Sequence, residues 1–97
     1  MIAVRRIRLD VLKPHHPNAL EFAQALAETG NDYRIRLMVL EVDEHTETLQ
    51  IVVEGQSINF TDIQETISNL GASLHSIDEV EVASDGIETS ADGADAA

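Results

Sequence analysis

Alternating apolar and polar residues predict a strand at the start of the chain. In residues 2–12, IAVRRIRLDVL, one face carries Ile7, Leu9 and Val11. The opposite face carries the charged side chains Arg6, Arg8 and Asp10. A period of two residues with one polar face is typical of a strand that is buried on one side only.

The same signal predicts three further strands, at residues 33–43, 48–54 and 73–82. The first of them, YRIRLMVLEVD, has one apolar face made of Ile35, Leu37 and Val39. Its other face carries Met38 and Leu40, so its second half is apolar on both sides. Because a patch of this kind is more typical of a contact than of bare surface, we expect another surface to cover it.

Residues 18–29, NALEFAQALAET, predict a helix. They are rich in good helix formers, and an apolar stripe recurs at helical spacing. This stripe consists of Leu20, Ala23, Leu26 and Ala27. Gly30 suits the position just past the end of the helix, because glycine often follows a last helical turn.

A second helix is predicted over residues 61–70, TDIQETISNL. Thr61 and Gln64 have the spacing of a capping box, in which two side chains satisfy backbone N–H groups of the first turn. The apolar stripe of this helix consists of Ile63, Ile67 and Leu70. Gly71 follows as a terminator.

The resulting order β-α-β-β-α-β predicts an α+β domain over residues 1–82, with the ferredoxin-like split β-α-β arrangement. Its four-stranded antiparallel sheet has the strand order 4-1-3-2, and both helices cover one face. The other face is left open, and we expect a subunit contact where its apolar residues Met38 and Leu40 lie near arginines. Residues 83–97 lack periodicity and are small, polar and acidic, which predicts a disordered tail.

Composition limits the class of protein. The chain has 97 residues and only 3% aromatic residues, so its core is small and oligomerisation would help to stabilise it. It has no cysteine, which excludes disulfides and thiolate metal sites. The opening stretch, MIAVRRIRLD, is too short and too charged for a signal peptide. No run of eighteen apolar residues, as a transmembrane helix needs, occurs. We therefore expect a soluble cytoplasmic protein.

The charge balance narrows the choice of partners. Eighteen Asp and Glu residues against six Lys and Arg residues give a formal charge of −12. Nucleic acids and anionic membranes would be repelled by such a protein, so neither is an expected partner. Because only one of the six basic residues is a lysine, adaptation to a salt-rich, halophilic cytoplasm is an alternative explanation for any single exposed carboxylate.

Positive and negative charges are also separated along the chain. The six basic residues all lie in or just after the first two predicted strands: Arg5, Arg6, Arg8, Lys13, Arg34 and Arg36. In the predicted topology the starts of these two strands share one edge of the sheet. The opposite edge, where they end, collects Asp10, His15, Glu41, Asp43, Glu47, His75 and Asp78.

Carboxylates placed close together repel one another unless something neutralises them. Since no arginine is expected at this edge, we expect Ca²⁺ or Mg²⁺, or the arginine end of a neighbouring subunit, to do so. The expected metal ligands are Asp10, Glu41, Asp43, Glu47 and Asp78, and the expected supporting residues are His15, His75 and Glu79. The expected subunit interface consists of Arg6, Arg8, Arg34, Arg36, Met38 and Leu40.

Other kinds of site remain as alternatives. Residues 43–54 are not an EF-hand, because His45 and Thr48 stand where a second acid and the essential glycine belong. A zinc or nickel site would use the four histidines with Asp78, although the HExxH spacing is absent. No phosphate loop, GxSxG motif or cysteine nucleophile occurs, so we expect a non-enzymatic protein. A small-molecule-sensing module with a ligand held between subunits, and a metal-dependent hydrolase using the edge carboxylates, are the other two hypotheses.

Three motifs carry a family resemblance. At LDVLKPHHP, LEVDEHTE and LHSIDEV the chain resembles the archaeal family "domain of unknown function 211", from about Ile7 to Val82. The resemblance implies a ferredoxin-like fold, assembly into homo-oligomeric rings and no established enzymatic activity. The motif residues in this chain are Asp10, Lys13, Pro14 and His15, then Glu41, Asp43 and Glu47, then His75, Ser76, Asp78 and Glu79. The chain departs from the family pattern by a second histidine at His16 and by its long acidic tail.

Overall fold

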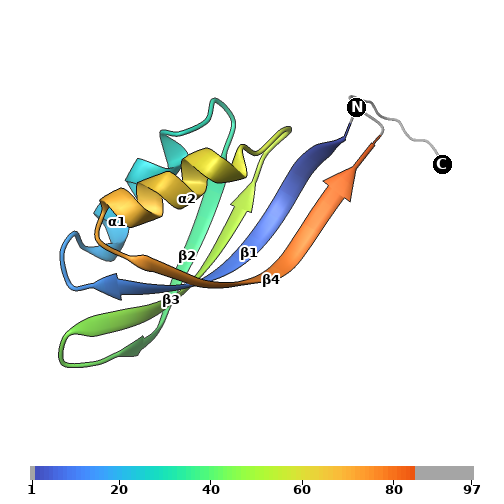
Figure 1. Cartoon of the computed structure of the whole chain (residues 1–97). Helices are drawn as coiled ribbons and strands as arrows, with labels where there is room; N and C mark the ends of the chain where they lie inside the picture. The colour runs from blue at the N-terminus through green and yellow to red at the C-terminus, as the bar shows by residue number, and fades with distance from the viewer. Residues whose placement is uncertain (1, 85–97) are drawn as a thin grey trace.

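Six elements form one layer of helices on one sheet in the computed structural model, which describes residues 2–84 (Figure 1). In chain order they are β1 (Ala3–Pro14), α1 (Ala19–Ala27), β2 (Arg34–Val42), β3 (Thr46–Glu54), α2 (Phe60–Asn69) and β4 (Ser73–Ala83). The strands lie in the order β2-β3-β1-β4, and every neighbouring pair is antiparallel. The ferredoxin-like α+β fold and its strand order are confirmed. Most of the predicted tail, residues 85–97, lies outside the described residues.

The core lies between the helices and the two central strands. Ile7, Leu9 and Val11 of β1 are buried as predicted. They meet equally buried residues of β3, of both helices and of the segment before α2: Leu49, Ile51, Val53, Phe22, Leu26, Ile58, Ile63 and Ile67. The other face of the sheet has no helix over it, so it is called the open face below (Figure 1).

Helix α1 buries Leu26 as predicted, but it buries Phe22 in place of Leu20. Phe22 and Leu26 are fully buried, whereas Leu20 is 67% exposed. Positions 20 and 22 are about 200° apart around a helix, so they cannot share a face, and burial of the larger aromatic ring decides the orientation. The helix begins after Asn18, whose side chain accepts a hydrogen bond from the Glu21 N–H in a capping box.

Gly30 does not play the predicted part of a helix terminator, since α1 ends at Ala27 and Glu28 is its C-cap. A Cβ atom at position 30 would collide with the ring of Tyr33. The Tyr33 hydroxyl in turn accepts a hydrogen bond from the Asn59 N–H at 2.7 Å. Glycine is therefore needed here for close packing of the tyrosine.

The N-cap of helix α2 lies two residues before the predicted one. This N-cap is Asn59, whose side chain accepts a hydrogen bond from the Asp62 N–H at 3.2 Å, so Thr61 lies inside the first turn. The predicted box of Thr61 and Gln64 is therefore wrong. The end of the helix is as predicted, because Gly71 has a φ of 84° in the left-handed region.

The helices leave both ends of the twisted sheet uncovered (Figure 1). The β2–β3 hairpin projects past one end of the helix layer, and β1 and β4 project past the other. On β2, Met38, Val39, Leu40 and Val42 are all exposed, which confirms that its second half is apolar on both faces. Neither helix of the described chain, at nine and ten residues, is long and apolar enough to cross a membrane.

Candidate functional site

A buried lysine lies at the end of β1 where only acids and histidines were expected. Lys13 continues the core-facing series of Ile7, Leu9 and Val11, and its side chain is completely buried. Its Nζ atom donates hydrogen bonds to the carbonyl oxygens of Pro14 at 2.8 Å and Pro17 at 2.6 Å. The ammonium group also lies 3.0 Å from Glu47 Oε1 in an ion pair. A buried charge is stable only with partners of this kind, and here oxygen atoms surround it.

The sequence analysis expected no arginine at this edge and gave Lys13 no part in neutralising its carboxylates, but Lys13 supplies a cation there. The physical reason is that β1 ends two residues later, and β3 begins two residues earlier, than predicted. β1 continues to Pro14 and β3 already begins at Thr46, so Lys13 and Glu47 are cross-strand neighbours rather than turn residues. Both side chains consequently lie on the helix side of the sheet.

His15 joins this pair to the β2–β3 turn. Its Nδ1 atom lies 3.0 Å from Glu47 Oε2, and its Nε2 atom lies 2.9 Å from the carbonyl oxygen of Glu44. Both partners only accept hydrogen bonds, so both are satisfied at once only when His15 is the doubly protonated imidazolium. The hydrogen bond to Glu47 is the main reason why the pKa of His15 is raised, and that to the Glu44 carbonyl adds to it. The same bond, followed by that to Lys13, lowers the pKa of Glu47. Lys13, His15 and Glu47 are called the Lys13 cluster below.

Asp10 and Asp78 lie together on the other side of the sheet. They line a hollow of about 240 Å³ on the open face with Arg8 and Leu40. The Ser76 hydroxyl donates a hydrogen bond to Asp78 at 2.7 Å. Arg8 also lines this hollow, so an arginine lies beside Asp10 and Asp78, where none was expected. Because Asp10 lies on the open face and Glu47 on the helix side, the sheet separates two of the expected metal ligands.

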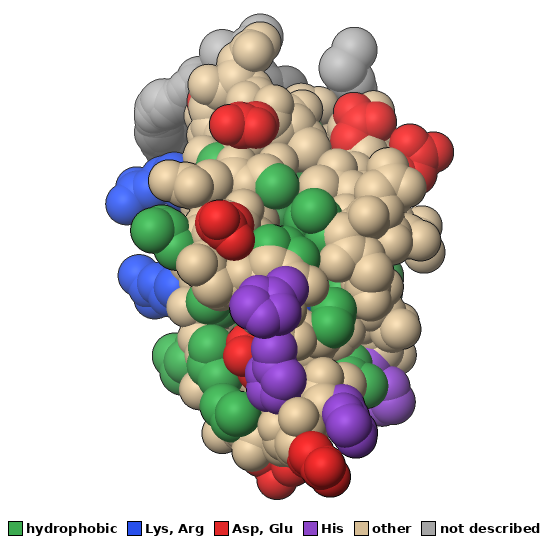
Figure 2. All heavy atoms as spheres, turned by 90° about the vertical axis from the view of Figure 1, so that its left-hand side faces the viewer, with side chains coloured by type: hydrophobic (Ala, Val, Ile, Leu, Met, Phe, Trp, Pro, Cys, Tyr) green, Lys and Arg blue, Asp and Glu red, His purple; other side chains and the backbone are tan. Residues whose placement is uncertain are grey.

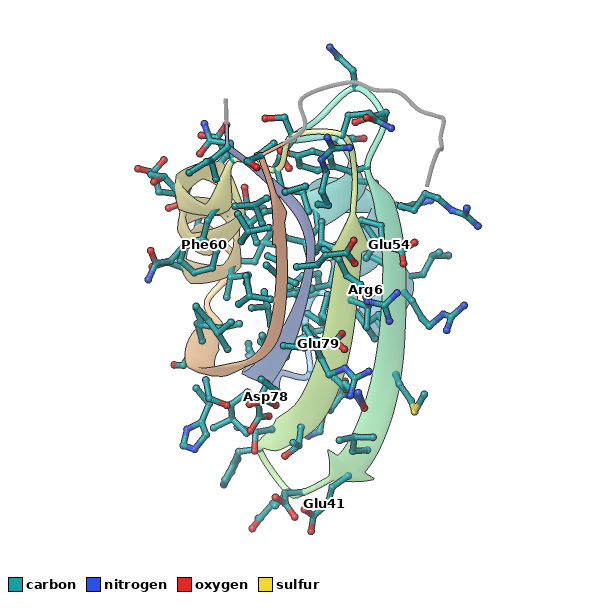
Figure 3. The ribbon with its side chains drawn as sticks, turned by 90° about the vertical axis from the view of Figure 1, so that its right-hand side faces the viewer. Arg6, Glu41, Glu54, Phe60, Asp78 and Glu79 are labelled. Carbon is teal, nitrogen blue, oxygen red and sulfur yellow. The ribbon has the colours of Figure 1, made fainter. Side chains whose placement is uncertain are left out.

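The remaining expected ligands lie at the hairpin tip. Glu41 and Asp43 are exposed there, and Glu41 lies at the end of the molecule below Asp78 in Figure 3. Histidine side chains gather near the same end, beside the carboxylates of the turn (Figure 2). His75 is exposed on β4, and His45 lies 3.9 Å from Glu44. Within residues 2–84, no group of three or more His, Asp or Glu side chains is placed to hold a metal ion. One copy of the described chain thus brings together Asp10 with Asp78, and Glu47 with His15, but not the whole expected set.

The arginines of the open face fall into two groups. Arg6 pairs with Glu54 and with Glu79, the latter at 3.0 Å from its Nε atom, and Arg8 lies 3.7 Å from Glu79 (Figure 3). The hydrogen bond from Arg6 thus engages Glu79, which was expected to support a metal. Arg34 and Arg36 on β2 are exposed and have no hydrogen bond or ion pair with any described side chain. The sequence analysis missed Glu54 and Glu79 as partners, although the register of the strands places them beside the arginines.

Comparison with known proteins identifies the family. The model of family DUF211, described as "Uncharacterized ArCR", matches residues 5–95. The uncharacterized protein MJ0319 of Methanocaldococcus jannaschii is 42% identical over 80 residues, which are 82% of each chain. The match confirms the resemblance carried by the three motifs and extends past Val82 into the acidic C-terminal segment. The chain therefore belongs to the DUF211 family.

Proposed function

We propose that this protein is a non-enzymatic, self-assembling domain that forms rings or filaments, and that divalent cations bind its carboxylates near subunit boundaries. The proposed self-assembly is supported mainly by one observation. Ten large apolar side chains of the described residues are exposed, and seven of them lie on the two edge strands, β2 and β4. These seven are Met38, Val39, Leu40, Val42, Ile77, Val80 and Val82.

The position of these residues favours a protein partner over open water. An edge strand also presents backbone N–H and C=O groups that no neighbouring strand satisfies, and proteins commonly protect such edges. Here the described edges carry apolar side chains instead of a covering helix or loop. A second copy of the chain has the same exposed edge strands and can pair with them. Burying their apolar side chains would also enlarge a small core.

The cation is a separate part of the proposal. Ca²⁺ and Mg²⁺ take oxygen ligands, and Ca²⁺ needs six to eight of them. Asp10 and Asp78 of one copy offer carboxylates beside the same hollow, and Glu41 and Asp43 are exposed at the hairpin tip. Since one described chain does not collect three such groups, we place the cation where the hairpin tip of one copy approaches a neighbour.

Sedimentation and calorimetry test the two parts separately. We expect the full chain to sediment as an oligomer, and millimolar Ca²⁺ added after a chelator to change its mass or release heat. A chain that sediments as a monomer at every salt concentration and with either addition contradicts self-assembly. An oligomer whose mass is unchanged, and which gives no heat on titration with Ca²⁺ or Mg²⁺, contradicts the cation alone.

A small-molecule-sensing module is the second candidate, and a hollow on the open face supports it. This hollow of about 360 Å³ lies near the start of β2 and is lined by Arg6, Arg34, Glu54 and Gln56, among others. Its volume is at the low end for ligand sites, and its lining is polar. A thermal-shift panel of amino acids and nucleotides separates the candidates, because a sensing module is stabilised by one ligand class whereas a purely self-assembling domain responds to none.

A further inference from the structure

The open face is organised in rows of cross-strand neighbours that continue through all four strands. One row consists of Glu81 on β4, Arg6 on β1, Glu54 on β3 and Arg34 on β2. The next row consists of Glu79, Arg8, Val52 and Arg36, in the same order of strands. Each row therefore ends in a glutamate on the β4 edge and in an arginine on the β2 edge.

The charges inside these rows are paired, and of the four charges at the ends only Glu79 pairs within the described chain, with Arg6 and Arg8. Arg6, in the middle of the sheet, pairs with both Glu54 and Glu79. At the β2 edge, Arg34 and Arg36 make no ion pair within residues 2–84, and the same holds for Glu81 at the β4 edge. One chain thus leaves positive charge on one edge and negative charge on the other.

The helix side of the same strands has apolar rows in matching positions. Val80, Ile7, Val53 and Ile35 form one row, and Ile77, Leu9, Ile51 and Leu37 form the next. The inner members are buried, but Val80 is 54% exposed and Ile77 is 47% exposed at the β4 edge. Both edges therefore combine charge on the open face with apolar side chains on the helix side.

Strand directions allow the sheet to continue into a second copy. β2 and β1 are both antiparallel to β3, and β4 is antiparallel to β1, so β2 of a neighbour placed beside β4 with the same face outward runs antiparallel to it. Antiparallel neighbours need no crossover and pair residue by residue. The stretches that carry the charges are regular, because no register shift lies between Glu79 and Glu81 or between Arg34 and Val39.

We propose that the β4 edge of one copy binds the β2 edge of the next, with Glu81 beside Arg34 and Glu79 beside Arg36. This inference rests on the proposed self-assembly and names the surface and register that produce it. In this register the helix side pairs Val80 with Ile35. Ile77 comes beside Leu37 only across the register shift at Asp78, where β4 has one extra residue. Every copy keeps one free β2 edge and one free β4 edge, so the contact is heterologous and generates a ring or a filament.

Other arrangements of the same edges are less favourable. A slip by one residue would turn the arginines toward the apolar helix side, because successive side chains alternate between faces. A slip by two residues would leave one of the two charge pairs without its partner. Pairing of β2 with β2 would set arginines opposite one another, and pairing of β4 with β4 would do the same to glutamates, which is destabilising.

Disulfide trapping tests the register, since the chain has no cysteine of its own. The full-length double variant Arg34→Cys with Glu81→Cys places one thiol on each edge. These positions lie three strand spacings apart in one chain, roughly 14 Å, whereas a disulfide needs Cα atoms closer than about 7 Å. Any disulfide must therefore join two copies. We expect a ladder of covalent multimers on a non-reducing denaturing gel after mild oxidation, and a second ladder with Arg36→Cys and Glu79→Cys.

Matched controls distinguish the proposed register from a symmetric contact and from a failure of self-assembly. The slipped pair Arg34→Cys with Glu79→Cys is expected to cross-link at least fivefold less, and Arg34→Cys alone is expected to stay monomeric on the gel. Efficient dimer formation by a single-cysteine variant would overturn the inference in favour of a symmetric contact. If wild type and variants sediment as oligomers but neither matched pair forms a ladder, edge pairing is overturned while self-assembly stands. If the wild type sediments as a monomer, the proposed self-assembly itself fails.

Discussion

The Lys13 cluster and the edge strands handle charge in opposite ways. In the cluster, Glu47 has a buried ammonium 3.0 Å away on one side and the His15 ring at the same distance on the other. On the β2 edge, Arg34 and Arg36 point into solvent with no partner among the described residues. The charges of the cluster are therefore paired within one chain, whereas Arg34 and Arg36 are left available for the proposed contact with a second copy.

This difference separates charge that stabilises the fold from charge that is available for assembly. Removing a partner from a buried ion pair leaves an uncompensated charge, while exposed ion pairs contribute little. We therefore expect substitutions in the Lys13 cluster to change stability and substitutions at the edges to change association. The predictions below test that separation.

The largest effect is expected for Lys13→Met. The substitution keeps much of the side-chain volume but leaves Glu47 and the carbonyl oxygens of Pro14 and Pro17 without their donor. Breaking a buried pair in this way costs about 3–5 kcal/mol of the free energy of unfolding. Urea denaturation at one fixed protein concentration measures the loss. Arg36→Met, which removes an exposed charge, is the control and is expected to change stability far less; equal effects of the two substitutions would refute the distinction.

A smaller loss is expected for Glu47→Gln. The amide keeps a similar shape and one acceptor, but Lys13 loses its counter-charge and His15 loses the bond that favours its protonated form. A buried group left partly unsatisfied costs about 1–3 kcal/mol. Glu79→Gln is the matched control, because its carboxylate pairs with Arg6 at a site about two-fifths exposed. We expect urea denaturation to show a clearly smaller change for the control, and a larger one would contradict the proposed role of the cluster.

The His15 bond should appear as a dependence of stability on pH. Because the hydrogen bond to Glu47 raises the pKa of His15 in the folded chain, its contribution is complete below the ordinary histidine value of about 6.5. It is lost as the pH rises through the raised folded value. Glu47, whose pKa is lowered, contributes above the ordinary glutamate value of about 4.3 and loses this contribution as the pH falls through its own folded value.

An NMR titration of the histidine ring protons checks the sign. We expect the pKa of His15 to lie above 6.5 in the wild type and to fall in Glu47→Gln. Urea denaturation across the same window should show the stability advantage of the wild type over His15→Asn shrinking with rising pH. An advantage that grows with rising pH would show that the neutral ring is the stabilising form.

The fold was largely predictable because its signals are periodic. Alternation, as in residues 2–12, and helical spacing, as in residues 61–70, predicted all six elements with bounds within two residues of those observed. The stripe of α1 was not predictable in the same way, because Leu20 and Phe22 both offer apolar surface. The choice between them depends on how a side chain fills the space above the sheet, which periodicity does not describe.

The candidate site was less predictable, since two residues of strand length decide it. Ending the first strand at Leu12 and beginning the third at Thr48 places Lys13 and Glu47 in turns, whereas the observed strands make them core-facing neighbours. The signal was present, because Lys13 continues the odd-numbered series of Ile7, Leu9 and Val11. The ion pairs of Arg6 depend on cross-strand register, which required the actual pairing of the strands.

The smallest effect on stability is expected for Glu81→Gln. This substitution tests directly whether an edge charge acts in association and not in stabilising the fold. Its carboxylate is exposed at the β4 edge, so the free energy of unfolding of a dilute chain should change by less than about 0.5 kcal/mol. Association stabilises the folded state in proportion to the logarithm of concentration. The melting temperature of the wild type should therefore rise with protein concentration more steeply than that of Glu81→Gln, with Asp62→Gln on α2 as a control that follows the wild type. Parallel concentration dependences of all three would mean that the β4 edge charge has no part in association, even if Glu47→Gln behaves as expected.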